Sequence, residues 1–320
     1  MIVTIHADAG PGVGLGHVAR CTGLAMALRR HGIMPVMLNA AGPTLTPHFS
    51  AQGLAEIRCQ GDIVSLLNAV QRVGAKALVA DSYRLDRLDL RQACGSLKLV
   101  WFDDSATLPQ QADMIVNGSP AALFLPYDLP PATVGLLGPA YQVVRSGLKS
   151  RDRSGPVRHL LVTYGGADPK NVGPRLASIL PVGIAVDFIV GPFADIPTNL
   201  PPHVTVHKAP GNMVDLIDRA DLAICAGGQT LFELAAAKLP VISIGIGEDQ
   251  RPNLEQLSRA GAILFGGWAD DVDFLAQLKQ VVDRALAEPS LRQCLAAQAH
   301  DLVDGQGADR IAQAVKTLLD

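Results

Sequence analysis

The chain has 320 residues, of which 48% are hydrophobic and 18% charged, and its formal net charge at pH 7 is −3. This length suits two domains of about 150 residues, each with a core of its own. Because lysines and arginines are scattered along a slightly acidic chain, nucleic acid or an anionic membrane surface is not expected as the main partner.

The cysteines and the apolar runs argue against further classes of protein. The five cysteines lie far apart and form no CxxC pair, which argues against a disulfide framework or a zinc site. The chain opens on a strand pattern instead of a signal peptide, and no apolar run reaches the roughly 18 residues that span a bilayer. We therefore expect a cytoplasmic protein without an integral membrane segment.

The most informative segment follows the first predicted strand, 2–6, and leads into a predicted helix. It is rich in glycine, ends in a histidine, and reads Asp8-Ala9-Gly10-Pro11-Gly12-Val13-Gly14-Leu15-Gly16-His17. Such a turn exposes bare backbone to a ligand, and imidazole titrates near neutral pH. We predict that His17 is catalytic and that Gly14 and Gly16 line the substrate site. The alternative is a phosphate-binding turn in which His17 only caps the helix.

Acidic residues follow two strands further along the first half. The strands predicted there are 35–39, 76–80, 98–102 and 113–116. Those at 76–80 and 98–102 are apolar on both sides, which is typical of a parallel sheet covered by helices on both faces. Asp81 follows the first, and Asp103 and Asp104 follow the second. Because such sheets bind ligands beyond the carboxyl ends of their strands, we expect these acids near His17, with Asp81 or Asp103 orienting the imidazole.

A polar, turn-prone segment from Lys149 to Pro156 places the domain boundary, giving domains 1–150 and 151–320. The strands predicted in the second half are 158–164, 184–190, 203–207, 222–225, 240–244 and 262–265. The helices predicted there are 171–180, 212–219, 229–238, 252–260, 271–286, 289–303 and 307–319. The sequence thus predicts an α/β protein with two doubly wound Rossmann-like domains facing across a cleft. The last helix is expected to pack back on the N-terminal domain.

Two glycine turns in the second half suit an anion. Gly165 and Gly166 follow the strand 158–164, where backbone N–H groups can approach a negative charge; the alternative is an ordinary tight turn. Gly227-Gly228-Gln229-Thr230 joins a buried strand to a helix. The first turn of that helix has free N–H donors and a positive dipole end, so a phosphate or diphosphate suits it.

Polar residues near these turns have two interpretations each. Glu233 is placed to accept hydrogen bonds from two ribose hydroxyls, but it also has the capping-box spacing to Thr230. Asp249 and Gln250 follow the strand 240–244 and face the predicted ligand edge, or else they cap the helix that begins near Pro252. The chain has no dinucleotide fingerprint, Walker lysine, HExxH motif or nucleophile elbow.

These motifs together resemble a known family. Their order and spacing carry the resemblance, in the segments Asp8–His17 with Arg20-Cys21, Asp81-Ser82-Tyr83, Phe102-Asp103-Asp104, Tyr141–Arg145, Gly165–Asp168, Gly227–Glu233 and Asp249-Gln250. From residue 1 to about 265 the chain is similar to the UDP-2,4-diacetamido-2,4,6-trideoxy-β-L-altropyranose hydrolases of pseudaminic acid biosynthesis. It is more distantly similar to the UDP-N-acetylglucosamine transferases of peptidoglycan synthesis. Both have the GT-B architecture.

The resemblance implies hydrolysis at the anomeric carbon of a UDP-sugar, with inversion and release of UDP. His17 matches the histidine that activates the attacking water, and His17, Asp81 and Tyr83 form the predicted catalytic set. The residues predicted to bind the substrate are Gly14, Gly16, Asp103, Arg145, Gly165, Gly166, Gly227, Gly228, Gln229, Thr230, Glu233, Asp249 and Gln250. No metal or other cofactor is implied, and we expect a monomer.

The chain departs from the family pattern at three positions. His6, Ser82 and Asp249 stand where the family usually has arginine, histidine and asparagine. A carboxylate at 249 would repel a diphosphate. These departures keep open an alternative function, a GT-B glycosyltransferase that moves the sugar to an acceptor other than water. A protein that only binds nucleotide sugars would have no need of His17.

Overall fold

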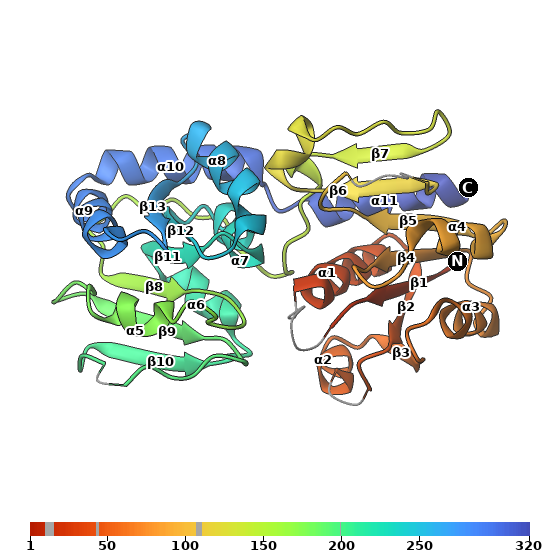
Figure 1. Cartoon of the computed structure of the whole chain (residues 1–320), viewed down its shortest axis with the longest axis horizontal. Helices are drawn as coiled ribbons and strands as arrows, with labels where there is room; N and C mark the ends of the chain where they lie inside the picture. The colour runs from red at the N-terminus through yellow and green to blue at the C-terminus, as the bar shows by residue number, and fades with distance from the viewer. Residues whose placement is uncertain (10–15, 43–44, 107–110, 199) are drawn as a thin grey trace. The chain divides into compact units, whose positions relative to one another are not determined.

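The structure is a computed structural model that describes residues 1–9, 16–42, 45–106, 111–198 and 200–320. Gly14 lies outside the described residues. The chain divides into two compact units, Met1–Ser146 with Gln306–Asp320, and Gly147–Gly305. Residues 306–320 thus belong to the first unit. Figure 1 labels the helices and strands of both units.

The first unit is built on a parallel sheet. Its strands lie in the order β3 (Ala55–Arg58), β2 (Met34–Asn39), β1 (Ile2–Ala7), β4 (Ala77–Asp81), β5 (Lys98–Phe102), β6 (Met114–Asn117) and β7 (Val134–Leu137). Every described pair is parallel. The strand order reverses between β1 and β4. The carboxyl ends of these two strands therefore flank the place where open α/β sheets bind ligands.

Helices cover both faces of this sheet, as its apolar strands predict. The helical segments of the unit are α1 (Gly16–Arg30), α2 (Thr46–Ala51), α3 (Ile63–Arg72), α4 (Arg87–Cys94), η2 (Pro120–Phe124), η3 (Pro139–Tyr141) and α11 (Gly307–Leu319). One core cluster joins α1 and α11 to Val79 and Val100. The other joins α3 and α4 to Leu78 and Leu99. Because successive strand residues point to opposite faces, both faces are buried.

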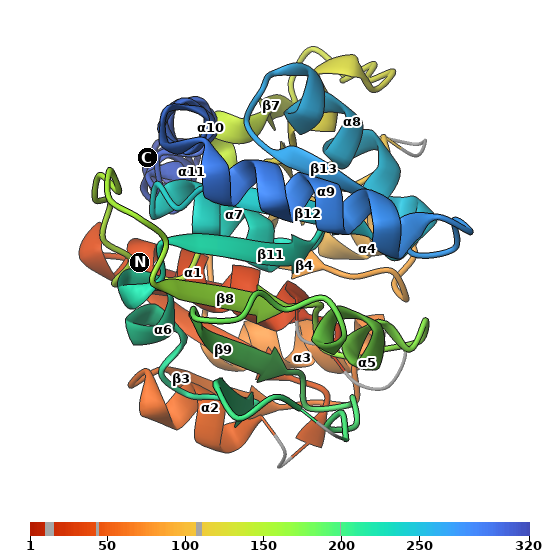
Figure 2. The same cartoon turned by 90° about the vertical axis from the view of Figure 1, so that its left-hand side faces the viewer.

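The second unit repeats this plan. Its strands lie in the order β10 (Val204–Lys208), β9 (Ala185–Val190), β8 (His159–Thr163), β11 (Leu222–Ala226), β12 (Val241–Gly245) and β13 (Leu264–Trp268). Its helical segments are α5 (Val172–Ala177), α6 (Met213–Arg219), α7 (Gln229–Ala236), η4 (Glu248–Gln250), α8 (Arg251–Arg259), α9 (Phe274–Ala287) and α10 (Pro289–Leu302). Figure 2 looks onto this unit, with α9 lying over β12 and β13. Here the strand order reverses between β8 and β11.

Two strands of the first sheet were not predicted from the sequence. They are β3 and β7, and each forms an edge of the sheet. The predicted strands each match an observed strand to within a few residues. No helix in the described part of the chain is long and apolar enough to span a bilayer.

Candidate active site

The imidazole of His17 binds the carboxylate of Asp81. His17 lies in the first turn of α1, after β1, and Asp81 is the last residue of β4. Nδ1 of His17 is 2.5 Å from Oδ1 of Asp81, and the two side chains are 7% and 1% exposed. The polar ends of β1 and β4 thus meet where the strand order reverses. The side chain of His17 points to a residue 64 positions away, so it does not act as a helix cap.

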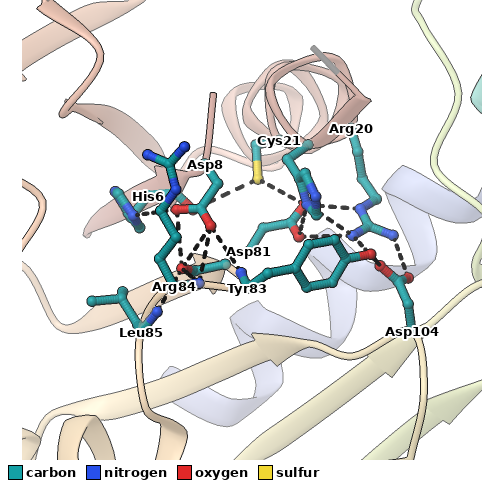
Figure 3. Close-up of polar contacts among 11 residues, drawn as sticks. His6, Asp8, Arg20, Cys21, Asp81, Tyr83, Arg84, Leu85 and Asp104 are labelled. Carbon is teal, nitrogen blue, oxygen red and sulfur yellow. Dashed lines mark hydrogen bonds and ion pairs between the residues drawn. The ribbon is translucent and has the colours of Figure 1, made fainter. Parts of the chain in front are cut away.

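Arg20, one turn further along α1, holds Asp81 with a fork of two hydrogen bonds. Its Nε donates to Oδ2 of Asp81 at 2.8 Å, and its Nη2 donates to Oδ1 at 2.7 Å. The same guanidinium donates to both oxygens of Asp104, at 2.8 and 3.0 Å. Figure 3 shows Arg20 joined to both carboxylates. This planar, doubly bidentate geometry is specific to arginine.

These contacts indicate which nitrogen of His17 carries the proton. Burial disfavours the charged form of Asp81, but the charge of Arg20 and the hydrogen bonds from His17 and Arg20 outweigh it, and the pKa of Asp81 is lowered. An ionised Asp81 can only accept hydrogen bonds, so Nδ1 donates and Nε2 keeps its lone pair. Within the described ranges, no residue hydrogen-bonds Nε2. His17 therefore has the tautomer of a general base.

Tyr83 packs against the imidazole and is anchored beside it. The rings of Tyr83 and His17 meet edge to face, with centroids 4.6 Å apart and planes at 87°. The hydroxyl of Tyr83 donates to Oδ2 of Asp104 at 2.7 Å (Figure 3). Burial and the negative charge of Asp104 raise the pKa of Tyr83, so the hydroxyl keeps its proton. Because Tyr83 is 68% exposed, it forms a wall of the site that a ligand can reach.

Asp8 fixes the turn that carries Tyr83. Its carboxylate accepts hydrogen bonds from the hydroxyl of Ser82 at 3.0 Å and from the N–H groups of Tyr83 and Arg84 at 2.8 and 3.2 Å. Nε2 of His6 lies 3.4 Å from Oδ1 of Asp8. Burial opposes ionisation, but these contacts lower the pKa of Asp8 to about 2. Two of the three departures from the family pattern, His6 and Ser82, thus contact the same carboxylate.

Two other predicted residues of the first unit have different surroundings. Asp103 accepts a hydrogen bond from the N–H of Ser105 at 3.1 Å and lies 3.4 Å from Nη1 of Arg87. Of the two acids proposed to orient the imidazole, the structure therefore pairs Asp81 with His17 and Asp103 with Arg87. Arg145 lies near His48; burial, and then the charge of Arg145, lowers the pKa of that histidine.

In the second unit, the predicted glycine turns lie at the reversal of strand order. Gly165 and Gly166 follow β8, while Gly227 and Gly228 join the neighbouring β11 to α7. Gly165 has a φ of +104°, a left-handed conformation that favours glycine. A Cβ added at Gly165, Gly166 or Gly228 would meet no atom of a described residue within 4 Å, so their backbone is open on that side. Among the described residues, none comes within 4 Å of a Cβ added at Gly16 of the first unit either.

The residues of α7 decide against the capping-box alternative. Gly228 is the N-cap, so Gln229 and Thr230 occupy the first two helical positions and Glu233 lies a turn further in. A capping box needs its Ser or Thr at the N-cap, which Thr230 does not occupy. Glu233 is only 1% exposed. It can reach a ligand only if the side chains that cover it move.

Gln250 links the turns that follow β11 and β12. Its Oε1 accepts hydrogen bonds from the N–H groups of Gly227 and Ile246, both at 3.2 Å. Asp249 is exposed in η4, just before α8. The structure thus brings Gln250 to the Gly227 turn, where its side chain holds the backbone of the loop. The side chain of Asp249 is exposed to solvent.

The residues around His17 do not fit a metal site. Among the described residues, His17, Asp81 and Asp104 offer ligand atoms within 4.8 Å of one another. The guanidinium of Arg20 binds both carboxylates, so it supplies the positive charge that a cation would bring. Arg20 was not among the predicted site residues, and Asp104 was predicted to lie near His17 but was given no role. The sequence signal for Arg20 was its place three residues after His17, on the same helix face.

Comparison with known proteins identifies the fold. No family model matches the chain. An uncharacterized protein of Methanocaldococcus jannaschii is 24% identical over 278 residues, covering 78% of this chain and 57% of its own length, so the chain spans little more than half of that relative. Spore coat polysaccharide biosynthesis protein SpsG of Bacillus subtilis is 24% identical over 340 residues, covering 100% of this chain and 99% of SpsG.

Two solved structures resemble the whole chain. Acinetobacter baumannii MurG has a TM-score of 0.67 at 14% identity and covers 99% of each chain. Spinosyn rhamnosyltransferase SpnG has a TM-score of 0.70 at 17% identity and covers 100% of each. The chain has the GT-B fold. The predicted fold class of two doubly wound α/β units is confirmed.

Proposed function

We propose that this chain is a nucleotide-sugar enzyme of polysaccharide biosynthesis, and that it acts as an inverting glycosyltransferase. His17 removes the proton of an acceptor hydroxyl, whose oxygen attacks the anomeric carbon as the nucleoside diphosphate leaves. The observation that carries this proposal is the pairing of Nδ1 of His17 with a buried, ionised Asp81, because it leaves Nε2 as the proton acceptor.

The chemistry requires little beyond a base. A nucleoside diphosphate is a good leaving group, so strong protonation of it is not needed. The attacking oxygen must lose its proton on the ring face opposite the leaving group, and a positioned base contributes about 10²- to 10⁴-fold to such a step. As the proton moves to Nε2, His17 becomes an imidazolium, and the adjacent carboxylate of Asp81 stabilises that charge.

The second unit supplies the proposed diphosphate site. The turns Gly165-Gly166 and Gly227-Gly228 come from neighbouring strands, with open backbone at Gly165, Gly166 and Gly228, and the N-terminus of α7 presents backbone N–H groups beside the second turn. Backbone N–H donors and a helix dipole together favour a phosphate group. We assign UDP to this site because of the family resemblance, with Gln229 and Thr230 at its edge.

The choice of acceptor rests on the comparisons. SpsG is named for polysaccharide biosynthesis and SpnG is named a rhamnosyltransferase, which supports transfer of the sugar to a carbohydrate or other hydroxyl acceptor. Hydrolysis of a UDP-diacetamido-trideoxy sugar is the second candidate, and one observation favours it. The residues that carry the resemblance to UDP-sugar hydrolases, among them Asp8, Asp81 and Tyr83, lie together around His17.

One assay separates the two candidates. The protein is incubated with UDP- and dTDP-sugars, with and without glycan acceptors, and release of the nucleoside diphosphate is followed; dTDP donors are included because SpnG was also solved with thymidine diphosphate. Release that requires an acceptor supports transfer, and release at an equal rate without one supports hydrolysis. NMR of the product should show inverted anomeric configuration. No release with any donor would contradict both candidates.

A further inference from the structure

We propose that Arg20 is a positioning residue that sets the charge around His17, because it binds the carboxylates of Asp81 and Asp104 at once. The benefit of this charge balance for catalysis rests on the proposed function. The charge balance among Arg20, Asp81 and Asp104 does not rest on it, and a titration of His17 tests that balance directly.

The contacts of Arg20 leave it little freedom. Four hydrogen bonds of 2.7 to 3.0 Å join it to the two carboxylates, and its side chain is 13% exposed. Its Cζ lies 4.8 Å from the centre of the Phe102 ring, so the guanidinium is also held from one face. Nη2, which donates to both carboxylates, is 3.4 Å from Nδ1 of His17. A change at Arg20 therefore acts on both acids and on the imidazole.

The charges that face His17 come from three elements. Arg20 and Cys21 belong to α1, Asp81 and Tyr83 come from the end of β4 and the turn after it, and Asp104 follows β5. Burial raises the pKa of the Cys21 thiol, and the pKa of Tyr83 is also raised, so both stay neutral at physiological pH. Residues 10–15, which precede His17, carry no titratable side chain.

The net charge of Arg20, Asp81 and Asp104 favours the role of His17 as a base. Two carboxylates and one guanidinium leave one net negative charge around a neutral imidazole, and none once His17 takes up a proton. That single excess charge stabilises the imidazolium that forms during the reaction. Without Arg20, two uncompensated carboxylates would hold a proton on His17 before the substrate binds, because nearby opposite charge favours the charged form. A protonated His17 has no lone pair with which to act as a base.

Two substitutions should therefore move the pKa of His17 in opposite directions. Arg20→Met removes the positive charge while keeping an unbranched side chain, and we expect the pKa of His17 to rise by about one unit or more. Asp104→Asn removes one negative charge and keeps the shape, and we expect the pKa to fall by about one unit. A residue that served only for packing would not produce shifts of opposite sign.

The measurement is an NMR titration of the full-length protein labelled in its histidine side chains. His17→Gln identifies the resonance of His17 among the eight histidines. The matched controls are Arg30→Met and Asp309→Asn, which break an ion pair of 2.6 Å between α1 and α11. Both controls should leave the titration of His17 where it is in the unaltered protein. If Arg20→Met does not fold, Arg20→Lys and Asp104→Asn carry the test, and Lys should keep the pKa nearer the original value because it keeps the charge.

Unchanged titration of His17 in folded Arg20→Met and Asp104→Asn, or shifts of the same sign in both, would overturn the proposal. Where a turnover assay exists, the acid limb of kcat/KM should follow the pKa of His17, so Arg20→Met should recover activity as the pH rises, while UDP affinity stays unchanged. If the opposite shifts are found but no donor is turned over, the role of Arg20 stands and the proposed function fails.

Discussion

At the scale of single residues, His17 combines burial with a carboxylate partner. It is buried, yet the partner on Nδ1 is a carboxylate that prepares Nε2 to take a proton. A histidine buried only for packing would not need a carboxylate that is itself fixed by an arginine fork. The arrangement is therefore better explained by chemistry than by stability, since the buried ion pair between Arg20 and Asp81 is weak grounds for stabilisation.

Replacing this imidazole should separate chemistry from binding. We expect His17→Ala to lower kcat by about 10²- to 10⁴-fold, because a general base contributes about that factor. The affinity for UDP, measured by calorimetry, should stay within a few-fold, since the diphosphate is assigned to the second unit. His31→Ala is the control, because His31 is a histidine of the same unit that pairs with Asp309. Undiminished turnover in His17→Ala would show that the base is elsewhere.

The carboxylate of Asp8 gives a residue-scale prediction about pH. Its pKa falls from 3.8 in the unfolded chain to about 2 in the folded one, so its ionised form stabilises the fold above pH 4 and this contribution is lost as the pH falls toward 2. The shift corresponds to about 2 kcal/mol. Asp8→Asn should therefore lower the free energy of unfolding at pH 5, and the difference from the unaltered protein should disappear near pH 2.

Urea titrations read by Trp101 in a Trp268→Phe background measure this effect, because Trp101 lies in the first unit and Trp268 in the second. Asp89→Asn, which alters an exposed carboxylate of the first unit, is the control. A difference between Asp8→Asn and the unaltered protein that persists at pH 2 would argue against an ionised Asp8 as its source.

At the scale of elements, the sequence predicts those strands and helices whose pattern is set by residues adjacent in the chain. The central strands β4 and β5 are apolar on both sides because helices bury both their faces, and this can be read from five residues. The edge strands β3 and β7 could not be found in this way. Ala55–Arg58 contains two charged residues and Val134–Leu137 is interrupted by Gly135. Both are partly exposed, and only pairing with β2 and β6 makes them strands.

In the site, too, the sequence predicts contacts that follow from strand order and misses those that depend on side-chain geometry. Placing His17 and Asp81 together needed only the rule that ligands bind at the carboxyl ends of parallel strands. Assigning Arg20 needed side-chain geometry, because its two partners lie 61 and 84 residues away. Likewise, the choice between Asp81 and Asp103 depended on which of them His17 binds, and no local spacing records that.

The polar segment at the domain boundary provides an element-scale prediction. Arg153 is only 7% exposed and donates to the carbonyl oxygens of Ile217, Ala220, Ala237 and Lys238, at the ends of α6 and α7. Burial lowers the pKa of Arg153 to about 10, so it is still charged at pH 7. Arg153→Met should destabilise the second unit by about 3 kcal/mol, because buried carbonyls at two helix ends lose their donors.

Urea unfolding read by Trp268 in a Trp101→Phe background measures this loss. Arg259→Met, at an arginine that is 72% exposed, should change the free energy of unfolding by less than about 0.5 kcal/mol. If Arg153→Met were as stable as that control, water would be satisfying the carbonyls and the segment would be a simple linker.

At the scale of the whole molecule, the two units differ in how the chain builds them. The second is one continuous segment. The first is closed by α11, whose Ile311, Ala312 and Val315 are fully buried in the cluster that also contains α1 and β1. Gly307, where α11 begins, approaches the backbone of Gln142 so closely that an added Cβ would lie 2.3 Å from its carbonyl oxygen. The first sheet therefore depends on residues that follow the second unit in the chain.

Dividing the chain should therefore have unequal effects. We expect residues 147–305 alone to unfold cooperatively, read by Trp268, and to bind UDP as the full chain does, because their core and both glycine turns are complete. Residues 1–305 should keep that transition but lose or greatly weaken the one read by Trp101, because removing α11 exposes the apolar face of α1 to water. The full-length protein, which contains residues 306–320, is the control and should show the full Trp101 transition. A Trp101 transition in 1–305 equal to that of the full chain would show that α1 and the sheet form a stable core without α11.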